Sequence, residues 1–479
     1  MKRRRILIHS HEFSAAHRQA LEAEGFEIVA VSQGRLEGLE HVSLGELYYG
    51  SPRLQEFARG IPARAPLPDR FVRQYARGIG RLGFLPNGDY YSFAGGSVPL
   101  IDLEDWAALH WRYAAGLLKA WSIDEVWFWW APHLGVDQAL WQAAQDLGLT
   151  CLSLRQLPFV NKFTASGARH ERVRLLPLVS AQAWSHGART PELFYMRPEK
   201  RRPFLSAAAD LGRDLLGKLF TRAGRDQLLT RAYLGATKRA WRPLIEAVEM
   251  LDPTLRPLAG LRRWQRRQWD AGRAARRFTR LDEIREPFVY FALHYEPELN
   301  SDVYGGEFAN QIDALGRLVA RLPEGWRLLV KENPQQQFLK RSWAFFERCG
   351  LLDRMDFVPD DTDSARLIER AAVVASLCGT VVYEAMLQGK CGIYFGDPWY
   401  AGLTGAVCWN EDLDLRSVAS RRVDRAVLDQ EINQWLSTCP DGIVAPRFDA
   451  LLPENGNWQS QALITAASLR KLSDSLAAD

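Results

Sequence analysis

Residues 288–293, FVYFAL, form an apolar run that gives way at once to the polar segment 294–302, HYEPELNSD. Six apolar residues bounded by polar ones are typical of a buried β-strand. Pro297 lacks a backbone N–H and therefore stops such a strand. The stretch predicts the first strand of a domain, with a histidine and two carboxylates at its carboxyl end.

Strand-like and helix-like segments alternate beyond this run. Their lengths are typical of parallel βαβ units in a doubly wound sheet. The C-terminal part therefore predicts a Rossmann-like domain over residues 286–455, followed by a helix over 456–479 that packs back. We expect strands within 327–334, 355–359, 372–377 and 390–397, and helices within 307–323, 337–350, 362–371 and 379–389.

The N-terminal part shows the same alternation and predicts a second Rossmann-like domain over residues 1–185. Residues 186–285 read as a helical, Arg-rich bridge. The expected fold class is α/β, with two doubly wound Rossmann-like domains in the two-lobed, GT-B-like architecture. Ligands of such sheets lie at the carboxyl ends of the strands. We expect strands within 5–10, 26–32, 124–132 and 149–154, and helices within 12–25 and 135–148.

The composition limits the class of protein. A chain of 479 residues exceeds one ordinary core, and 47% hydrophobic with 25% charged residues is ordinary for a globular protein. The formal net charge is +4, and no recognised binding motif points to nucleic acid as a partner. None of the six cysteines forms a CxxC pair. We therefore expect a reducing cytoplasm, with neither a metal site nor a disulfide framework.

Two basic segments bear on localisation. The start, MKRRR, is followed by only three apolar residues, Ile6–Ile8, which is too short for a signal peptide. No segment approaches the roughly 18 apolar residues of a membrane span. Residues 261–280 carry eight Arg and one Asp. This run is either a solvated helix face, or a patch over Arg262–Arg280 that meets a polyanionic polymer or anionic lipid at the inner membrane face.

Polar residues follow several predicted strands of the C-terminal domain, where they would share one sheet edge. Lys331 can meet a phosphate as a point charge. Gly379 and Thr380 begin a helix whose N-terminus favours an anion, with Thr380 as the expected cap. Glu384, one turn on, can take ribose hydroxyls. The alternatives are ordinary turns and helix caps. The candidate binding residues are His294, Glu296, Glu298, Lys331, Asn333, Gly379, Thr380, Glu384 and Asp397.

The order of these motifs resembles the capsular polysaccharide biosynthesis family. The matching pieces are YFALHYEPE, GWRLLVKENP and SLCGTVVYEAMLQGKCGIYFGDPWY, within residues 286–402. The resemblance implies a GT-B-like protein similar to transferases of 3-deoxy-manno-octulosonic acid (Kdo), which use CMP-Kdo. The family pattern reads Lys-Glu-His-Pro where this chain has Asn333, at a position expected to meet the CMP phosphate or the departing group. This departure leaves the donor, and the effect of Asn333 on activity, open.

The resemblance implies a cytoplasmic glycosyltransferase that moves a sugar from a nucleotide donor to a glycan or glycolipid acceptor, with no cofactor or metal. Its base should come from the N-terminal domain, where His11 with Glu12, or His133 with Asp137, can pair. All four residues can instead be ordinary loop or helix-cap residues. A nucleotide-sugar 2-epimerase of the same two-lobed shape and a non-catalytic binding component of capsule assembly remain alternatives.

Overall fold

The structure is a computed structural model that divides the chain into two compact units. The first comprises Met1–Ile79, Pro99–Glu199 and Arg425–Asp479, and the second comprises Gly80–Val98 and Lys200–Asp424. The structure describes residues 3–10, 13–33, 36–43, 46–47, 50–62, 67–69, 71–72, 75, 100–133, 135–159, 161–167, 246, 250–251, 256–296, 299–334, 336, 341, 343–445 and 457–478.

The first unit is built on a six-stranded sheet in the order β3-β2-β1-β4-β5-β6. All neighbouring strands are parallel except β5 and β6, which form an antiparallel pair. The sequence did not predict this sixth strand. The strands are β1 (Arg4–Ser10), β2 (Phe26–Gln33), β3 (Glu40–Val42), β4 (Glu125–Phe128), β5 (Thr150–Gln156) and β6 (Phe163–Gly167).

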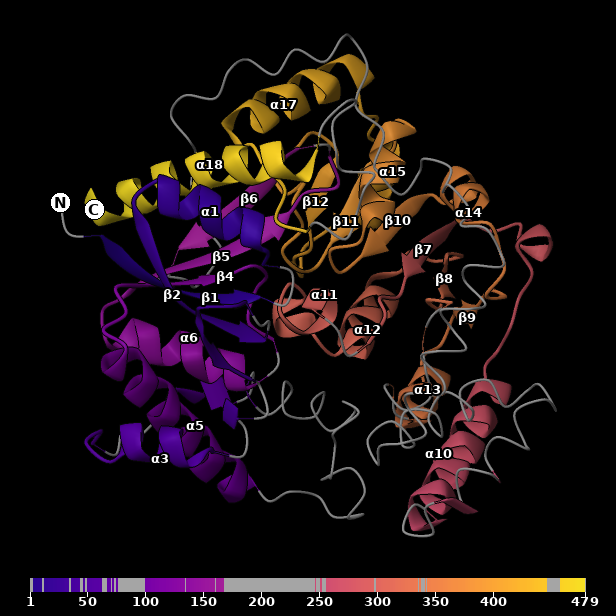
Figure 1. Ribbon diagram of the computed structural model, residues 1–479. Helices are drawn as coiled ribbons and strands as arrows, with labels where there is room; N and C mark the ends of the chain where they lie inside the picture. The colour runs from indigo at the N-terminus through magenta and orange to yellow at the C-terminus, as the bar shows by residue number, and fades with distance from the viewer. Residues whose placement is uncertain are drawn as a thin grey trace. The chain divides into compact units, whose positions relative to one another are not determined.

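Helices cover this sheet. The helix α18 lies along α1 in Figure 1, and its Leu469 and Leu472 are buried in one cluster with Ile6 and Ile8 of β1. Burial of these apolar side chains stabilises the packing of the chain's end on its beginning. The helices are α1 (Ala15–Ala23), α3 (Pro52–Ala58), α5 (Leu100–Ala120), α6 (Val136–Asp146), α17 (Arg425–Thr438) and α18 (Trp458–Ala478).

The chain joins the first unit at Arg425, earlier than the expected position 456. The reason is a set of polar contacts with the β5–β6 hairpin. The buried Lys162 amine lies 2.8 Å from Asp441 Oδ1 and donates to the Cys439 carbonyl at 3.2 Å, and Gln156 Oε1 accepts the Val444 N–H at 2.8 Å. The expected limits at 185 and 285 stay predictions, since much of that bridge lies outside the described residues.

The second unit holds a six-stranded sheet in the order β12-β11-β10-β7-β8-β9, with every neighbouring pair parallel. The two sheets confirm the predicted fold class. Chain direction switches between β7 and β10, because β8 follows β7 on one side and β11 follows β10 on the other. The strands are β7 (Phe288–Ala292), β8 (Arg327–Lys331), β9 (Met355–Phe357), β10 (Val373–Ser376), β11 (Gly392–Tyr394) and β12 (Ala406–Cys408).

The helices of the second unit follow its strands. In Figure 1, α10 lies beside α13, and the two pack together. The helix expected within 307–323 begins only at Gln311, because a 3-10 turn, Gly306–Phe308, precedes it. The helices are α10 (Arg256–Ala274), α11 (Leu299–Asp302), α12 (Gln311–Arg321), α13 (Trp343–Gly350), α14 (Ser364–Arg370), α15 (Thr380–Leu387) and α16 (Leu415–Ser420), with a further 3-10 turn at Leu281–Glu283.

Candidate functional site

His294 lies at the switch point of the second sheet, just beyond the carboxyl end of β7. The Cys378 backbone N–H, just beyond β10, donates to His294 Nε2 at 3.3 Å, and Ser376 Oγ lies 3.3 Å from the same nitrogen. Because Nε2 accepts the Cys378 bond, this pattern assigns the ring proton to Nδ1. The switch point is where doubly wound sheets bind their ligands. His294 and the Gly379 segment, both expected at this sheet edge, are in contact there.

Gly379 is closely packed, so any side chain at this position would force a neighbour to move. A Cβ at this position would lie 2.7 Å from Ser376 Oγ and 3.3 Å from His294 Cε1. The Tyr400 hydroxyl donates to the Gly379 carbonyl at 2.7 Å. These contacts fix the turn between β10 and α15 against the imidazole.

The start of α15 differs from the expectation in one respect. Gly379, not Thr380, is the N-cap, and it offers no side chain to the first turn. Thr380 lies inside the helix, and its hydroxyl donates to Glu384 Oε1 at 3.1 Å. An N-terminus without a capping side chain leaves backbone N–H groups for an anionic ligand, with the half-buried Glu384 one turn away.

Lys331 ends β8, and its amine donates to Ser364 Oγ at 2.9 Å. Burial lowers the pKa of this amine, while the nearby carboxylates Asp363, Asp360 and Asp361 oppose that shift. The acidic segment 360–363 thus lies close enough to Lys331 to favour the charged form of its amine. Phosphate binding by Lys331 stays a prediction.

Glu296 belongs to a polar cluster under the loop after β7. Its Oε2 accepts from Gln311 Nε2 at 3.2 Å and from Arg341 Nε at 3.1 Å. Burial raises the pKa of the Glu296 carboxyl, and the Arg341 guanidinium opposes that rise. The sequence did not single out Gln311 or Arg341, because each becomes a neighbour of Glu296 only through the fold.

Two of the remaining donor-side candidates, Asn333 and Asp397, make backbone hydrogen bonds. The Asn333 carbonyl accepts the N–H of Gln336 at 2.9 Å, and the Asp397 N–H donates to the Tyr304 carbonyl at 2.6 Å. Glu298 lies outside the described residues.

The acceptor-side candidates belong to the first unit. Asp137 is fully buried, and its Oδ2 accepts the His133 backbone N–H at 2.9 Å and lies 3.8 Å from Nε2 of the buried His9. The His133 ring places Nδ1 2.8 Å from the Ala131 carbonyl oxygen. His11 and Glu12 lie outside the described residues. The catalytic roles of these residues stay predictions.

The Arg-rich run is divided between the interior and the surface. The Arg276 side chain is only 3% exposed and binds Glu332, and Arg273 binds Asp360. Arg267 and Arg280 are exposed, and Trp264 is 52% exposed. Arg276 is therefore an internal residue, whereas Trp264, Arg267 and Arg280 are available to a partner.

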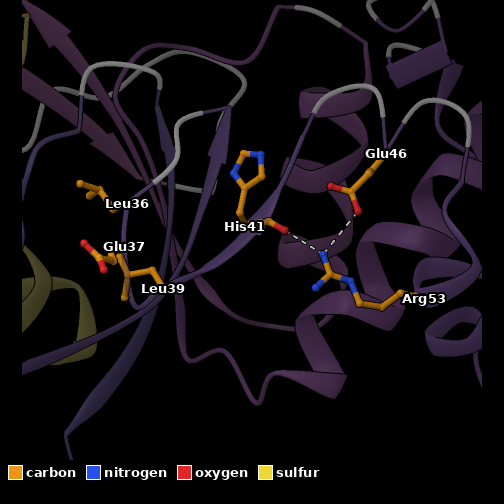
Figure 2. A pocket seen from close by; sticks show the side chains of 6 residues that line it. All are labelled: Leu36, Glu37, Leu39, His41, Glu46 and Arg53. Carbon is orange, nitrogen blue, oxygen red and sulfur yellow. Dashed lines mark hydrogen bonds and ion pairs between the residues drawn. The ribbon is translucent and has the colours of Figure 1, made fainter.

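Three further observations concern a surface depression, metal ligands and membrane spans. A depression of about 610 Å³ in the first unit is lined by Leu36, Glu37, Leu39, His41, Glu46 and Arg53, with Arg53 held by the His41 carbonyl and Glu46 (Figure 2). It contains none of the predicted site residues.

Across the described ranges, no three His, Cys, Asp or Glu side chains converge as metal ligands would. Within the same ranges, no helix combines the length and apolar character that crossing a bilayer requires.

The model of the capsule polysaccharide biosynthesis protein family matches residues 298–439. This segment is similar to that family. The match includes β8, β10 and α15, and so confirms the resemblance carried by KENP and the Cys378-Gly379-Thr380 turn. No curated protein matches the chain.

Solved structures with similar architecture share little sequence with the chain. KpsC of Thermosulfurimonas dismutans, a beta Kdo 2,7 transferase, is 12% identical, covering 75% of this chain and 89% of that one, with a TM-score of 0.31. UDP-GlcNAc 2-epimerase of Methanocaldococcus jannaschii is 10% identical, covering 91% and 99%, with a TM-score of 0.25. MurG of Acinetobacter baumannii is 9% identical, covering 98% and 99%, with a TM-score of 0.24. TM-scores of this size carry no argument about activity.

Proposed function

We propose that the chain is a glycosyltransferase of capsule polysaccharide assembly that uses a nucleotide-sugar donor. The observation that carries the proposal is the convergence of His294, Cys378 and Gly379 at the switch point, within and beside the segment that matches the capsule family. A doubly wound sheet binds nucleotides at this edge. A fold of this class alone serves many reactions, so the site and not the fold supports the assignment.

The donor side supplies binding and electrostatic stabilisation. The N-terminus of α15 takes the diphosphate or monophosphate, and Lys331 balances charge that develops on the leaving phosphate. Glu384 takes the ribose hydroxyls, and the Asn333 amide contacts the phosphate or base. Glu296, Glu298 and Asp397 complete this set. The donor proposed first is a CMP-linked ulosonic acid such as Kdo, on the strength of the motif order.

The acceptor side supplies the base. A glycan or glycolipid hydroxyl must be held in line and deprotonated. His133 with Asp137, and His11 with Glu12, are the proposed groups. The observed contact of Asp137 with the His133 backbone supports a positioned loop at this place. No resident cofactor or metal is part of the proposal.

The proposed location is the cytoplasm, at the inner face of the membrane. The exposed Trp264, Arg267 and Arg280 support a peripheral contact with anionic lipid, since an aromatic ring and cations together suit a headgroup surface.

Product analysis tests the reaction. The purified chain is incubated with CMP-Kdo and a capsule-type glycolipid, and separately with UDP-GlcNAc. Transfer of the sugar with release of CMP is the expected result. Conversion of UDP-GlcNAc to its 2-epimer without an acceptor would instead assign the epimerase reaction. Turnover of neither donor, in folded protein, would favour a non-catalytic component.

A further inference from the structure

Arg341 joins the ends of two neighbouring strands with one side chain. Its Nη2 donates to the His294 carbonyl at 2.9 Å, its Nε to Glu296 Oε2 at 3.1 Å and its Nη1 to Glu332 Oε1 at 3.0 Å. His294 and Glu296 follow β7, and Glu332 follows β8. The Arg341 side chain is 1% exposed, and its guanidinium lies 4.4 Å from the Phe345 ring centroid.

Arg276 holds Glu332 from the other side. Its Nη1 donates to Glu332 Oε2 at 2.7 Å, so the two oxygens of this carboxylate bind two different arginines. The Arg276 guanidinium also lies 4.9 Å from the Phe357 ring centroid. Arg276 follows α10 directly, and thus connects the Arg-rich helix to the loop after β8.

This network of charged side chains is better suited to fixing the geometry of the two loops than to stabilising the fold. Two arginines face two glutamates in a dry environment, and desolvation offsets much of the attraction in such groups. A guanidinium, however, presents its donors in a rigid planar fork. Three donors of Arg341 therefore define the distance and orientation between the two loops.

The two loops carry the candidate donor-site residues. The His294 carbonyl bound by Arg341 belongs to the residue whose ring meets Cys378, and Glu332 stands between Lys331 and Asn333 in the chain. Any movement of the Arg341 anchors therefore displaces ligand-binding groups at both strand ends.

We propose that Arg341 is a positioning residue of the donor site, and that Arg276 supports it through Glu332. The role in binding rests on the function proposed above. Arg341 holds the loop 293–296 and the segment 331–333 in a fixed arrangement. It affects ligand binding only through the residues of these two segments.

Amide hydrogen exchange tests the positioning independently of any ligand. The reporters are the N–H groups of Leu293, His294 and Glu296, which donate to the Lys331 carbonyl, Gln311 Oε1 and Gln336 Oε1. In Arg341→Lys, which keeps the charge but loses the fork, exchange at these amides should rise about tenfold. The reference amides are those of Gly392 and Trp409 in the β11–β12 region, and they should stay at the wild-type rate.

Two control variants distinguish a positioning role of Arg341 from a general loss of stability. Arg348→Lys makes the same replacement at an exposed arginine paired with Asp313, and should change neither set of amides. Val418→Ala weakens the buried core under α16, away from both loops, and should leave the loop reporters no faster than the reference amides. Arg276→Lys serves as a second variant if Arg341→Lys does not fold, with the same expected pattern.

Nucleotide affinity gives the readout for function. In Arg341→Lys, the Kd for CMP should rise about tenfold, while Arg348→Lys and Val418→Ala keep the wild-type value. Unchanged exchange at the loop reporters, or equal acceleration at the reference amides, would overturn the positioning role. If the wild-type protein binds no nucleotide, the proposed function fails, and the exchange result still decides whether Arg341 holds the two loops.

Discussion

The Cys378 backbone N–H donates a 3.3 Å hydrogen bond to His294 Nε2, which joins the carboxyl ends of β10 and β7 at the switch point of the second sheet. The residue after Cys378 is Gly379, where an added Cβ would lie 3.3 Å from the same imidazole. This contact connects the His294 imidazole to the N-terminus of α15, which favours an anionic ligand. Disturbing the contact should therefore weaken ligand binding.

Gly379→Ala should disrupt this contact. The new Cβ would lie 2.7 Å from Ser376 Oγ and 3.3 Å from the His294 ring, so the turn or the ring must move. We expect a loss of about 1–3 kcal/mol in stability, as for other overpacked sites, together with a loss of nucleotide affinity. Thermal unfolding and calorimetric titration measure the two effects.

Gly316→Ala is the matched control. Gly316 lies inside α12 with open space where its Cβ would be, so alanine should stabilise the helix by about 0.5–1 kcal/mol. Equal affinities of the two variants for nucleotide would argue against a binding role for the Gly379 turn.

Glu384→Ala should remove recognition of the ribose. A hydrogen bond to a charged group contributes about 1.5–3 kcal/mol, and a carboxylate that takes ribose hydroxyls favours CMP over 2′-deoxy-CMP. The variant should bind both nucleotides equally, whereas Glu369→Ala, at an exposed glutamate of α14, should retain the preference. Retained discrimination in Glu384→Ala would place the ribose elsewhere.

His17 should make the first unit sensitive to mild acid. Burial lowers the pKa of this histidine from 6.5 to about 4, against a backbone hydrogen bond with Ile443 that favours the charged form. The unfolded chain therefore binds more protons between these values, so stability is complete above pH 6.5 and falls as the pH drops toward 4. The loss amounts to about 3 kcal/mol, at 1.36 kcal/mol per unit.

Denaturant unfolding of the first unit across pH 4–7 measures this dependence. His17→Gln should flatten the curve in that window. His41→Gln, in β3 of the same unit, controls for the removal of a histidine. A wild-type slope that persists in His17→Gln would assign the acid sensitivity to another group.

The surface part of the Arg-rich run should bind anionic vesicles. Juxtamembrane arginines contribute about 1 kcal/mol each, so Arg267→Gln with Arg280→Gln should weaken binding to phosphatidylserine vesicles by roughly thirtyfold. Arg348→Gln with Arg366→Gln removes two other exposed arginines of the second unit and should leave binding unchanged. Sedimentation with vesicles distinguishes the pairs, and equal losses would exclude a specific membrane face.

The sequence predicted the strands of the two sheets except β3, β6 and β12, because buried parallel strands read as uninterrupted apolar runs such as FVYFAL. It also predicted that His294 and Gly379 would lie at one sheet edge, since the carboxyl ends of parallel strands share an edge. It did not predict the Cys378 bond, the Gly379 cap or the return of the chain at Arg425. These depend on backbone geometry and on contacts between residues distant in the chain, such as Lys162 with Asp441.

The Arg-rich run shows the same limit. A count of eight arginines predicts a basic surface, but the sequence cannot show that Arg276 turns inward to a buried carboxylate. Only the fold brings Arg276 and Arg341 to the two oxygens of Glu332.

Calorimetric titration with CMP, UDP and GDP tests the central proposal most directly, with Glu384→Ala and Lys331→Ala measured beside the wild-type chain. We predict preferential binding of CMP that both variants lose. Preference for UDP would indicate a hexose or hexosamine donor and would favour the epimerase reaction. Folded protein that binds none of the three nucleotides would contradict the glycosyltransferase account.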